Sequence, residues 1–417
     1  MNVEIVKSDA PRPLAHYNEA VKLKPWVFAA GQIASDYKTG VPPEARRHAE
    51  FPYYGSDIKL QTRYILNNLK KTFAAASSGF DNVIKAQVFL TDLKNFNGFD
   101  EVWREFFPVP PPRTTVGTTG LLVPGTLVEI DLIGYSADSG TKHKVVKSSG
   151  PQPLANYSEA VVFNDLIFAA GQLASDFSTG VPAEAKKRPG FPYYGSDIKR
   201  QTYFVLENLK KTFEQAGGSL DTVFKAQVFL RDLADFSGFD EVWKEYFKQP
   251  PARTTIGTTG LLVGDTLVEI DLIGHVKGGK VNKERITSTN PQPLANYSEA
   301  FRVGNLVFAA GQLASDFRSG IAQEARLDPA FPYYGSAIKK QTRYVLNNLK
   351  TTLQAAGSSL DRVVKAQVFL TDLNHFFAFD EVWKEFFPSP PPRTTVGTSG
   401  LLVNGALVEI DVIAAAS

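Results

Sequence analysis

The chain has 417 residues, of which 45 are basic, 43 are acidic and none is cysteine. The formal charge of +2 gives no general attraction to nucleic acid or to an anionic membrane. The lack of cysteine excludes disulfides, thiolate nucleophiles, zinc–thiolate sites and iron–sulfur clusters. The first residues lack the apolar core of a secretory signal, and no apolar run approaches the length of a membrane span. We therefore expect a soluble cytoplasmic protein without nucleic-acid or membrane partners.

The sequence repeats itself at a constant offset of 140 residues. The segments FAAGQ, FPYYGS, KAQVFL and FDEVW each occur three times, beginning in the first copy at Phe28, Phe51, Lys85 and Phe99. Units of this length are whole domains, because solenoid repeats have periods of roughly 20–50 residues.

We predict three domains, over residues 1–138, 139–278 and 279–417. The junctions at 136–149 and 276–288 are rich in Gly, Ser and Lys, which is typical of linkers or of the first strand of the next domain.

The pattern within the first domain predicts five strands and two helices. Strands are expected over 17–24, 26–34, 84–90, 114–123 and 126–133, and helices over 57–76 and 99–107. Ser56 is the expected N-cap of the first helix, whose buried stripe is formed by Ile58, Thr62, Ile65, Leu69 and Phe73. The loop at 41–55 is rich in Pro, charge and aromatic residues.

The last two strands are expected to pair as a hairpin, because the residues between them are turn formers in every copy. They are Pro124-Gly125, Gly264-Asp265 and Asn404-Gly405. The order β-β-α-β-α-β-β indicates an α+β fold in which two helices cover one face of a mostly antiparallel sheet. The open faces of the three sheets can be buried by packing around a common axis.

The final segment of each domain carries one Arg and one Glu, 16 residues apart. They are Arg113 and Glu129, Arg253 and Glu269, and Arg393 and Glu409. A guanidinium group matches a carboxylate in a bidentate way, so an Arg in a cleft suits a 2-imino acid. A partly buried Glu has a raised pKa and can handle the proton of a water that attacks a C=N carbon. A structural ion pair at the sheet edge is the competing interpretation.

Each domain resembles the RidA (YjgF-like) family of reactive-intermediate deaminases, through motifs that are spread along its whole length. The matching motifs are Y-x-x-A-V at Tyr17, F-x-x-G-Q at Phe28, Q-T-x-x-x-L-x-N-L at Gln61, V-F-L-x-D-L at Val88, P-R-x-x-V at Pro112 and L-V-E-I at Leu127. They recur with small changes in the second and third copies.

The resemblance implies a chorismate-mutase-like fold, in which three domains form a trimer with clefts between neighbours. This chain resembles that trimer written as one polypeptide, so we expect a monomeric chain acting as a pseudo-trimer. The family hydrolyses imines and enamines to 2-oxo acids and ammonia, which implies a small-molecule substrate carrying a carboxylate, and neither a cofactor nor a metal.

The resemblance also implies site residues at equivalent positions of the three copies. The catalytic candidates are the three Arg and three Glu named above. The substrate-binding candidates are Tyr17, Tyr157 and Tyr297, Gly31, Gly171 and Gly311, Thr115, Thr255 and Thr395, and Asp100, Asp240 and Asp380. Each has a simpler interpretation: a core tyrosine, a glycine bulge, an ordinary strand threonine, and a carboxylate favoured in the first turn of a helix.

Three positions depart from the family pattern. Ala30 stands where Ser is frequent, Thr115 where Cys is common, and Asp100 where Asn is common; the loop at 41–55 is also longer than usual. An Asp near a carboxylate-binding Arg would repel an anionic substrate or pair with a cationic one. Tyr53 and Tyr54 in the long loop are expected either to line the cleft or to anchor the helix that follows.

Other classes of site are poorly supported. The five histidines do not recur at equivalent positions, since His16 matches Asn156 and Asn296, which excludes a His triad or His metal site in every copy. RNA cleavage, also attributed to the family, is disfavoured by the balanced charge. A different deaminase or hydrolase reaction and a non-catalytic ligand-binding module remain open alternatives, because a fold does not fix a function.

Overall fold

The computed structural model describes residues 3–51, 55–188, 190, 195–330 and 335–416. Tyr53 and Tyr54 lie outside the described residues, so their expected role stays a prediction. No helix in the described ranges is long and apolar enough to cross a membrane.

Each repeat folds into two long helices and a seven-stranded sheet. Repeat 1 contains β1 (Glu4–Val6), β2 (Ala20–Leu23), β3 (Trp26–Ala29), β4 (Gln32–Ile33), α1 (Asp57–Ala75), β5 (Val83–Leu90), α2 (Phe96–Phe106), β6 (Arg113–Gly117) and β7 (Val128–Tyr135). Repeat 2 contains β8 (Lys144–Val146), β9 (Ala160–Phe163), β10 (Leu166–Ala169), β11 (Gln172–Leu173), α3 (Asp197–Gln215), β12 (Val223–Leu230), α4 (Phe236–Tyr246), β13 (Ala252–Gly257) and β14 (Val268–His275). Repeat 3 contains β15 (Lys283–Ile286), β16 (Ala300–Val303), β17 (Leu306–Ala309), β18 (Gln312–Leu313), α5 (Ala337–Ala355), β19 (Val363–Leu370), α6 (Phe376–Phe386), β20 (Arg393–Gly397) and β21 (Val408–Ala415).

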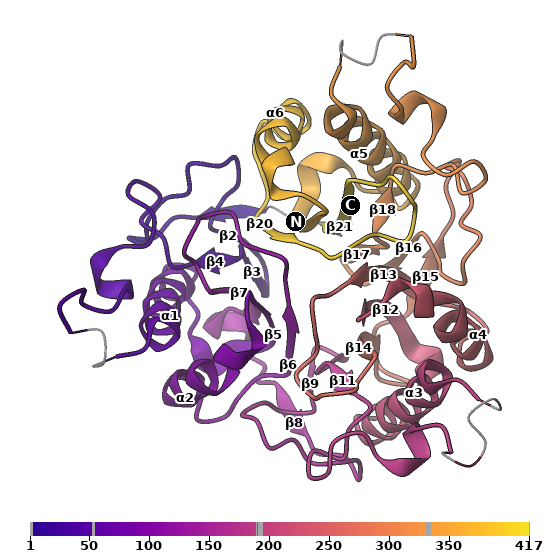
Figure 1. Cartoon of the computed structure of the whole chain (residues 1–417), viewed down its shortest axis with the longest axis horizontal. Helices are drawn as coiled ribbons and strands as arrows, with labels where there is room; N and C mark the ends of the chain where they lie inside the picture. Colours follow the sequence, from indigo (N-terminus) through magenta and orange to yellow (C-terminus); the bar gives the residue numbers. More distant parts are fainter. Residues whose placement is uncertain (1–2, 52–54, 189, 191–194, 331–334, 417) are drawn as a thin grey trace.

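The predicted fold class is confirmed: three α+β units surround a common axis. Figure 1 shows the helices on the periphery and the sheets around the centre. The first sheet has the order β1-β2-β3-β7-β5-β6, with β4 beside β7, and its pairs are antiparallel except β5–β6. The predicted stripe of α1, from Ile58 to Phe73, is buried against this sheet.

The predicted hairpin is wrong. β6 pairs in parallel with β5, with Val88 opposite Thr115, and β7 pairs with the other edge of β5. The turn residues are present, but the chain after Gly117 leaves the sheet and contacts another repeat. The Gly117 N–H donates to the carbonyl of Gly260 at 3.0 Å, and Leu121 forms an isolated bridge with Val396. Contacts between repeats therefore take the place of hairpin pairing.

Each unit begins with a short strand, one of the two alternatives for the junctions, and the predicted strand over 26–34 is divided into two strands. β1, β8 and β15 pair with the outer edges of β2, β9 and β16, so the polar junctions contain the first strand of the following unit. The short β4 is separated from β3 by Ala30 and Gly31, and it places Ile33 opposite Glu129.

Buried ion pairs join the three sheets near the axis. Each joins a Lys of the strand that follows the first helix to an Asp of the last strand in another repeat: Lys85 to Asp271 at 2.5 Å, Lys365 to Asp131 at 2.6 Å, and Lys225 to Asp411. All six side chains are at most 6% exposed. These pairs link each repeat to a neighbour through buried opposite charges, and breaking one would leave a buried charge without its partner.

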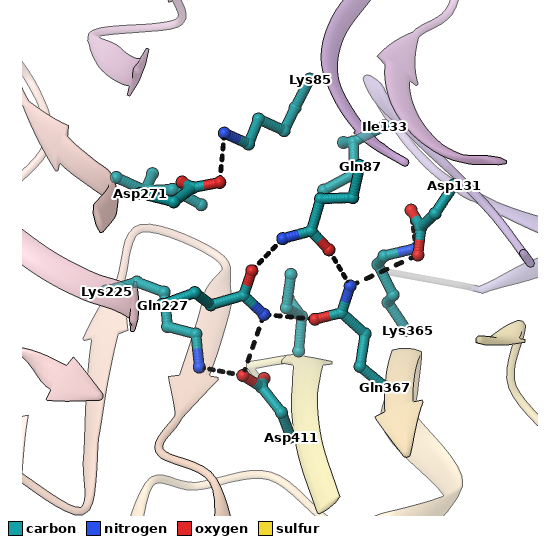
Figure 2. Close-up of a pocket in the computed structure, with 12 residues that line it drawn as sticks. Lys85, Gln87, Asp131, Ile133, Lys225, Gln227, Asp271, Lys365, Gln367 and Asp411 are labelled. Atoms are coloured by element: carbon teal, nitrogen blue, oxygen red, sulfur yellow. Dashed lines mark hydrogen bonds and ion pairs between the residues drawn. The ribbon is translucent and has the colours of Figure 1, made fainter. Parts of the chain in front are cut away.

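Three glutamines form a hydrogen-bonded ring around the axis (Figure 2). The side-chain amide of Gln87 donates to Gln227, that of Gln227 to Gln367, and that of Gln367 back to Gln87. Each amide thus acts as both donor and acceptor, which satisfies buried polar groups of all three repeats at once.

Candidate active site

The predicted site residues come together at the three boundaries between repeats, which are called clefts A, B and C. Cleft A lies between repeats 1 and 2, cleft B between repeats 2 and 3, and cleft C between repeats 3 and 1. In each cleft the first-named repeat supplies the predicted Asp, Arg and Thr, and the other supplies the Tyr, Gly and Glu. Cleft A contains Asp100, Arg113, Thr115, Tyr157, Gly171 and Glu269; cleft B contains Asp240, Arg253, Thr255, Tyr297, Gly311 and Glu409; cleft C contains Asp380, Arg393, Thr395, Tyr17, Gly31 and Glu129.

Cavities open where these residues meet. A cavity of about 220 Å³ in cleft A is lined by Arg113, Tyr157 and Glu269 among others. A cavity of about 390 Å³ in cleft C is lined by the equivalent Arg393, Tyr17 and Glu129. Neither site can be assembled from one repeat alone.

The Arg of each cleft is held in a box of aromatic rings. In cleft A the guanidinium carbon of Arg113 lies 5.1 Å from the ring centres of Phe99 and Trp103, 5.5 Å from Phe96 and 5.9 Å from Tyr157. Three of these rings come from α2 of the same repeat, while Tyr157 comes from the neighbour. Cation–π attraction and burial therefore hold the guanidinium in one orientation before a ligand arrives.

The Asp of each cleft pairs with this Arg. Asp100 Oδ1 accepts from Arg113 Nη2 at 2.8 Å, and Asp100 Oδ2 accepts from Arg104 Nε at 3.0 Å. Asp100 is therefore already paired with two cations of the protein, so it is not free to pair with a cationic substrate, while its charge still competes with an anionic substrate for Arg113. Lys244 and Lys384 replace Arg104 in clefts B and C.

The pairing leaves donor capacity on the Arg. Among the described residues, no hydrogen-bond partner is found for Arg113 Nε, Arg253 Nη2, or Arg393 Nε and Nη1. These buried N–H groups have unused donor capacity. The competing interpretation pairs each Arg with the Glu of its own repeat. The two do not meet, because that Glu lies in a different cleft.

The Glu of each cleft is buried, which raises the pKa of its carboxyl group. Burial, the main cause, and the nearby Asp131 carboxylate together raise the pKa of Glu129 to about 8, although the Thr395 N–H, Lys365 and Arg393 lower it. Burial raises the pKa values of Glu269 and Glu409 to about 8 as well. A carboxyl group with such a pKa exchanges protons near neutral pH.

Gly31 and Thr395 shape the pocket of Glu129. A Cβ atom on Gly31 would collide with the Glu129 carboxylate and would lie 2.9 Å from the Thr394 methyl. The glycine is therefore required to seat the Glu129 carboxyl group, whereas the role expected from the resemblance was substrate binding. Thr395 offers its backbone N–H to Glu129, and Thr115 and Thr255 do the same for the Glu of clefts A and B.

Tyr17 lies between the Arg and Glu of cleft C. Its ring centre is 5.6 Å from the guanidinium carbon of Arg393, and its hydroxyl donates to the Tyr37 hydroxyl at 3.2 Å. Burial raises the pKa of Tyr17 to about 12, so the hydroxyl stays protonated at neutral pH. Its position fits a role in binding, as expected from the sequence, and it is also packed as a buried tyrosine.

Sequence reasoning missed several residues of the clefts. Tyr37 is one of them, because its counterparts Phe177 and Phe317 lack the hydroxyl. Phe96 was placed before the predicted helix, and α2 begins at that residue. Asp131 lies outside the cleft, in the axial ion pair with Lys365, but it shares a strand face with Glu129 and raises the pKa of that Glu.

Comparisons with known proteins agree with this architecture. A family model described as endoribonuclease L-PSP matches residues 7–136, 147–276 and 287–416. A RutC family protein of Pyrococcus abyssi is 36% identical over 135 residues, which are 32% of this chain and 97% of that protein. A protein of Dermatophagoides farinae named 2-iminobutanoate/2-iminopropanoate deaminase is 37% identical over 136 residues, 32% of this chain and 97% of that protein.

Two further proteins are similar to this chain, one in sequence and one in structure. The protein named 3-aminoacrylate deaminase RutC of Acinetobacter baylyi is 33% identical over 136 residues, covering 32% of this chain and 98% of that protein. A crystal structure of a chorismatase aligns over 81% of this chain and 94% of its own, with a TM-score of 0.52 and 13% identity. That likeness concerns the fold alone. The chain belongs to the endoribonuclease L-PSP family, the family to which RidA (YjgF-like) proteins belong, and contains three tandem copies of its domain.

Proposed function

We propose that each cleft hydrolyses imines and enamines derived from 2-amino acids to 2-oxo acids and ammonia. At the level of the family, the relatives named as deaminases of imino and aminoacrylate compounds support an enzyme that acts on imines. The observation that carries the proposal is a buried Glu with a pKa of about 8, in a small cavity that also contains a buried Arg of the neighbouring repeat.

The charge balance of the cleft supports an anionic substrate. The Asp100 carboxylate is shared by Arg113 and Arg104, which leaves one net positive charge in this group. Glu269 is largely protonated below pH 8 and therefore adds little repulsion. A substrate carboxylate can accept hydrogen bonds from the unpaired N–H groups of the Arg, which orients the C=N bond toward the Glu.

The proposed reaction follows from the proton that the Glu carries. The carboxyl group protonates the imine nitrogen, or the terminal carbon of an enamine to form the imine. Water then adds to the C=N carbon, and its proton passes to the Glu carboxylate. The Glu carboxyl group next donates this proton to the amino nitrogen of the carbinolamine, and the carbinolamine hydroxyl gives its own proton to the Glu carboxylate as the C–N bond breaks, which releases ammonia and the 2-oxo acid and leaves the Glu protonated. These proton transfers all take place at the buried Glu of the cleft.

The family description also names ribonuclease activity, for which the clefts provide little support. Cavities of about 220 and 390 Å³ have the size of small-molecule sites. The formal net charge of +2 provides little of the electrostatic attraction on which nucleic-acid binding depends.

The proposal is tested by ammonia release from a 2-imino acid generated in the assay by an amino-acid oxidase. The native protein should accelerate release above the spontaneous rate, and the variant with Glu129→Gln, Glu269→Gln and Glu409→Gln should not. A matched control replaces the exposed Glu101, Glu241 and Glu381 by Gln, which should leave the rate unchanged. Hydrolysis at the native rate by the first variant, with its fold intact by circular dichroism, would refute the role of the buried Glu.

A further inference from the structure

The three clefts share their reacting groups but differ at their mouths. In cleft A, Arg104 binds Asp100 through Nε and donates from Nη2 to the Leu154 carbonyl at 3.1 Å. Its side chain thus bridges repeats 1 and 2 across the mouth. In cleft C the equivalent residue is Lys384, whose single ammonium group lies 3.1 Å from Asp380 and whose side chain lines the cavity. A lysine cannot donate in two directions with the fixed fork of a guanidinium.

Two apolar side chains lie at the entrance of cleft C. Phe377 lines the cavity from repeat 3, and its ring centre lies 5.8 Å from that of Phe376, a member of the aromatic box around Arg393. Leu14 lines the same cavity from repeat 1. Phe377 is 81% exposed and Leu14 is 80% exposed, so both offer apolar surface to a ligand.

Phe377 is particular to cleft C. The equivalent residues are Asn97 in cleft A and Ser237 in cleft B, whereas Leu14 has leucine counterparts in the other clefts. The cavity is also larger, about 390 Å³ in cleft C against about 220 Å³ in cleft A. The open mouth, the larger volume and the exposed aromatic ring therefore occur together at one of the three boundaries.

We propose that cleft C prefers imines with an aromatic side chain, that cleft A prefers imines with a small side chain, and that Phe377 determines this difference. The inference rests on the proposed function and deepens it. With the substrate carboxylate at Arg393 and the C=N bond at Glu129, an aromatic side chain extends toward the mouth and packs against Phe377. Burial of two apolar surfaces favours such a substrate, and the Arg104 bridge of cleft A obstructs the same path.

Single-cleft variants test the inference. Glu269→Gln with Glu409→Gln leaves cleft C, and Glu129→Gln with Glu409→Gln leaves cleft A. The substrates are the imines that an amino-acid oxidase forms from phenylalanine and alanine. We expect the ratio of kcat/KM for the aromatic imine to that for the small imine to be about tenfold higher in cleft C than in cleft A. Equal ratios in the two variants would overturn the inference.

Reciprocal substitutions assign the effect to the mouth. Adding Phe377→Ser to the cleft C variant introduces the residue of cleft B and should bring the ratio close to that of cleft A. Adding Asn97→Phe and Arg104→Lys to the cleft A variant should raise its ratio toward that of cleft C. If Phe377→Ser leaves the ratio unchanged, Phe377 does not determine specificity.

Binding separates this inference from the proposed reaction. Calorimetry of the native chain should detect pyruvate at all clefts, and tight binding of phenylpyruvate at one site per chain that Phe377→Ser weakens about tenfold. Selective binding without ammonia release would refute the proposed reaction and retain the selectivity. Ammonia release with equal ratios and three equal phenylpyruvate sites would retain the reaction and refute the selectivity.

Discussion

The carboxylate of Asp100 lies 2.8 Å from the guanidinium of Arg113, inside the protein and at the place where a substrate carboxylate is expected to bind. The cleft therefore contains its own counter-ion. This pairing recurs as Asp240 with Arg253 at 2.9 Å and as Asp380 with Arg393 at 2.8 Å. It weakens the attraction of each Arg for an anion without using all of its donors.

Asp100→Asn should strengthen binding of an anionic ligand in cleft A, because it removes the competing negative charge and keeps the side-chain shape. We expect pyruvate to bind one site of the chain about tenfold more tightly, while the uncharged pyruvamide gains little. Calorimetry with both ligands measures the difference. Equal gains for the two ligands would show that the charge of Asp100 does not control affinity.

The buried Glu residues should make stability depend on pH. Their folded-state pKa values of about 8 lie above the ordinary value of 4.5, so the folded chain retains protons that the unfolded chain has released. The free energy of unfolding should therefore fall as pH rises from about 4.5 to about 8, and this contribution should level off above pH 8. Activity that needs the protonated carboxyl group should decline over the upper end of that range.

Denaturant titrations of the native chain and the triple Glu→Gln variant at pH 6 and pH 9 check this sign. The variant should be the more stable protein at pH 9, by an amount on the order of a few kcal/mol, and should lose less stability between the two pH values. A steeper loss in the variant would contradict the assigned pKa shifts.

The ion pairs at the axis should contribute more to stability than those at the surface. Lys85→Ala leaves Asp271 buried without its cation and should lower the free energy of unfolding by roughly 3–5 kcal/mol. Lys59→Ala breaks the exposed pair with Glu101 and should cost about 0–1 kcal/mol. Urea unfolding of the two variants compares them directly. Equal losses would mean that the axial pairs do not hold the repeats together.

A single chain is expected to be the complete assembly. The open face of each sheet is buried against the other two repeats, in an apolar cluster that includes Phe28, Phe168 and Phe308. Light scattering should give a mass near 45.7 kDa, that of one chain. A mass three times larger would indicate that the repeats associate between chains.

Much of the fold was predictable because the periodic signals are local. The stripe of α1 from Ile58 to Phe73 and the alternation around Lys85 arise from residues close in sequence. The hairpin prediction failed because Gly117 pairs with Gly260 and Leu121 pairs with Val396, both in other repeats, which no local pattern reveals. The turn-forming residues Pro124-Gly125 predict that the chain turns. They do not predict which strand the returning segment pairs with.

The types of residue in the clefts were predictable from the resemblance, while their partners were not. Arg113 and Glu129 are 16 residues apart in sequence, yet they belong to different clefts. The role of Asp100 depends on how α2 is oriented relative to β6. The role of Phe377 depends on which repeat faces it. These are properties of the packing between elements distant in sequence.

The pairing of Arg and Glu from neighbouring repeats is tested most directly by two double variants. Arg113→Ala with Glu269→Gln affects cleft A alone, whereas Arg113→Ala with Glu129→Gln affects clefts A and C.

Ammonia release from the alanine-derived imine should be no lower in the first variant than in Arg113→Ala alone, at about two-thirds of the native rate if the clefts contribute equally. The second variant should retain about one-third. The opposite order, with the greater loss in Arg113→Ala with Glu269→Gln, would contradict clefts built from two repeats.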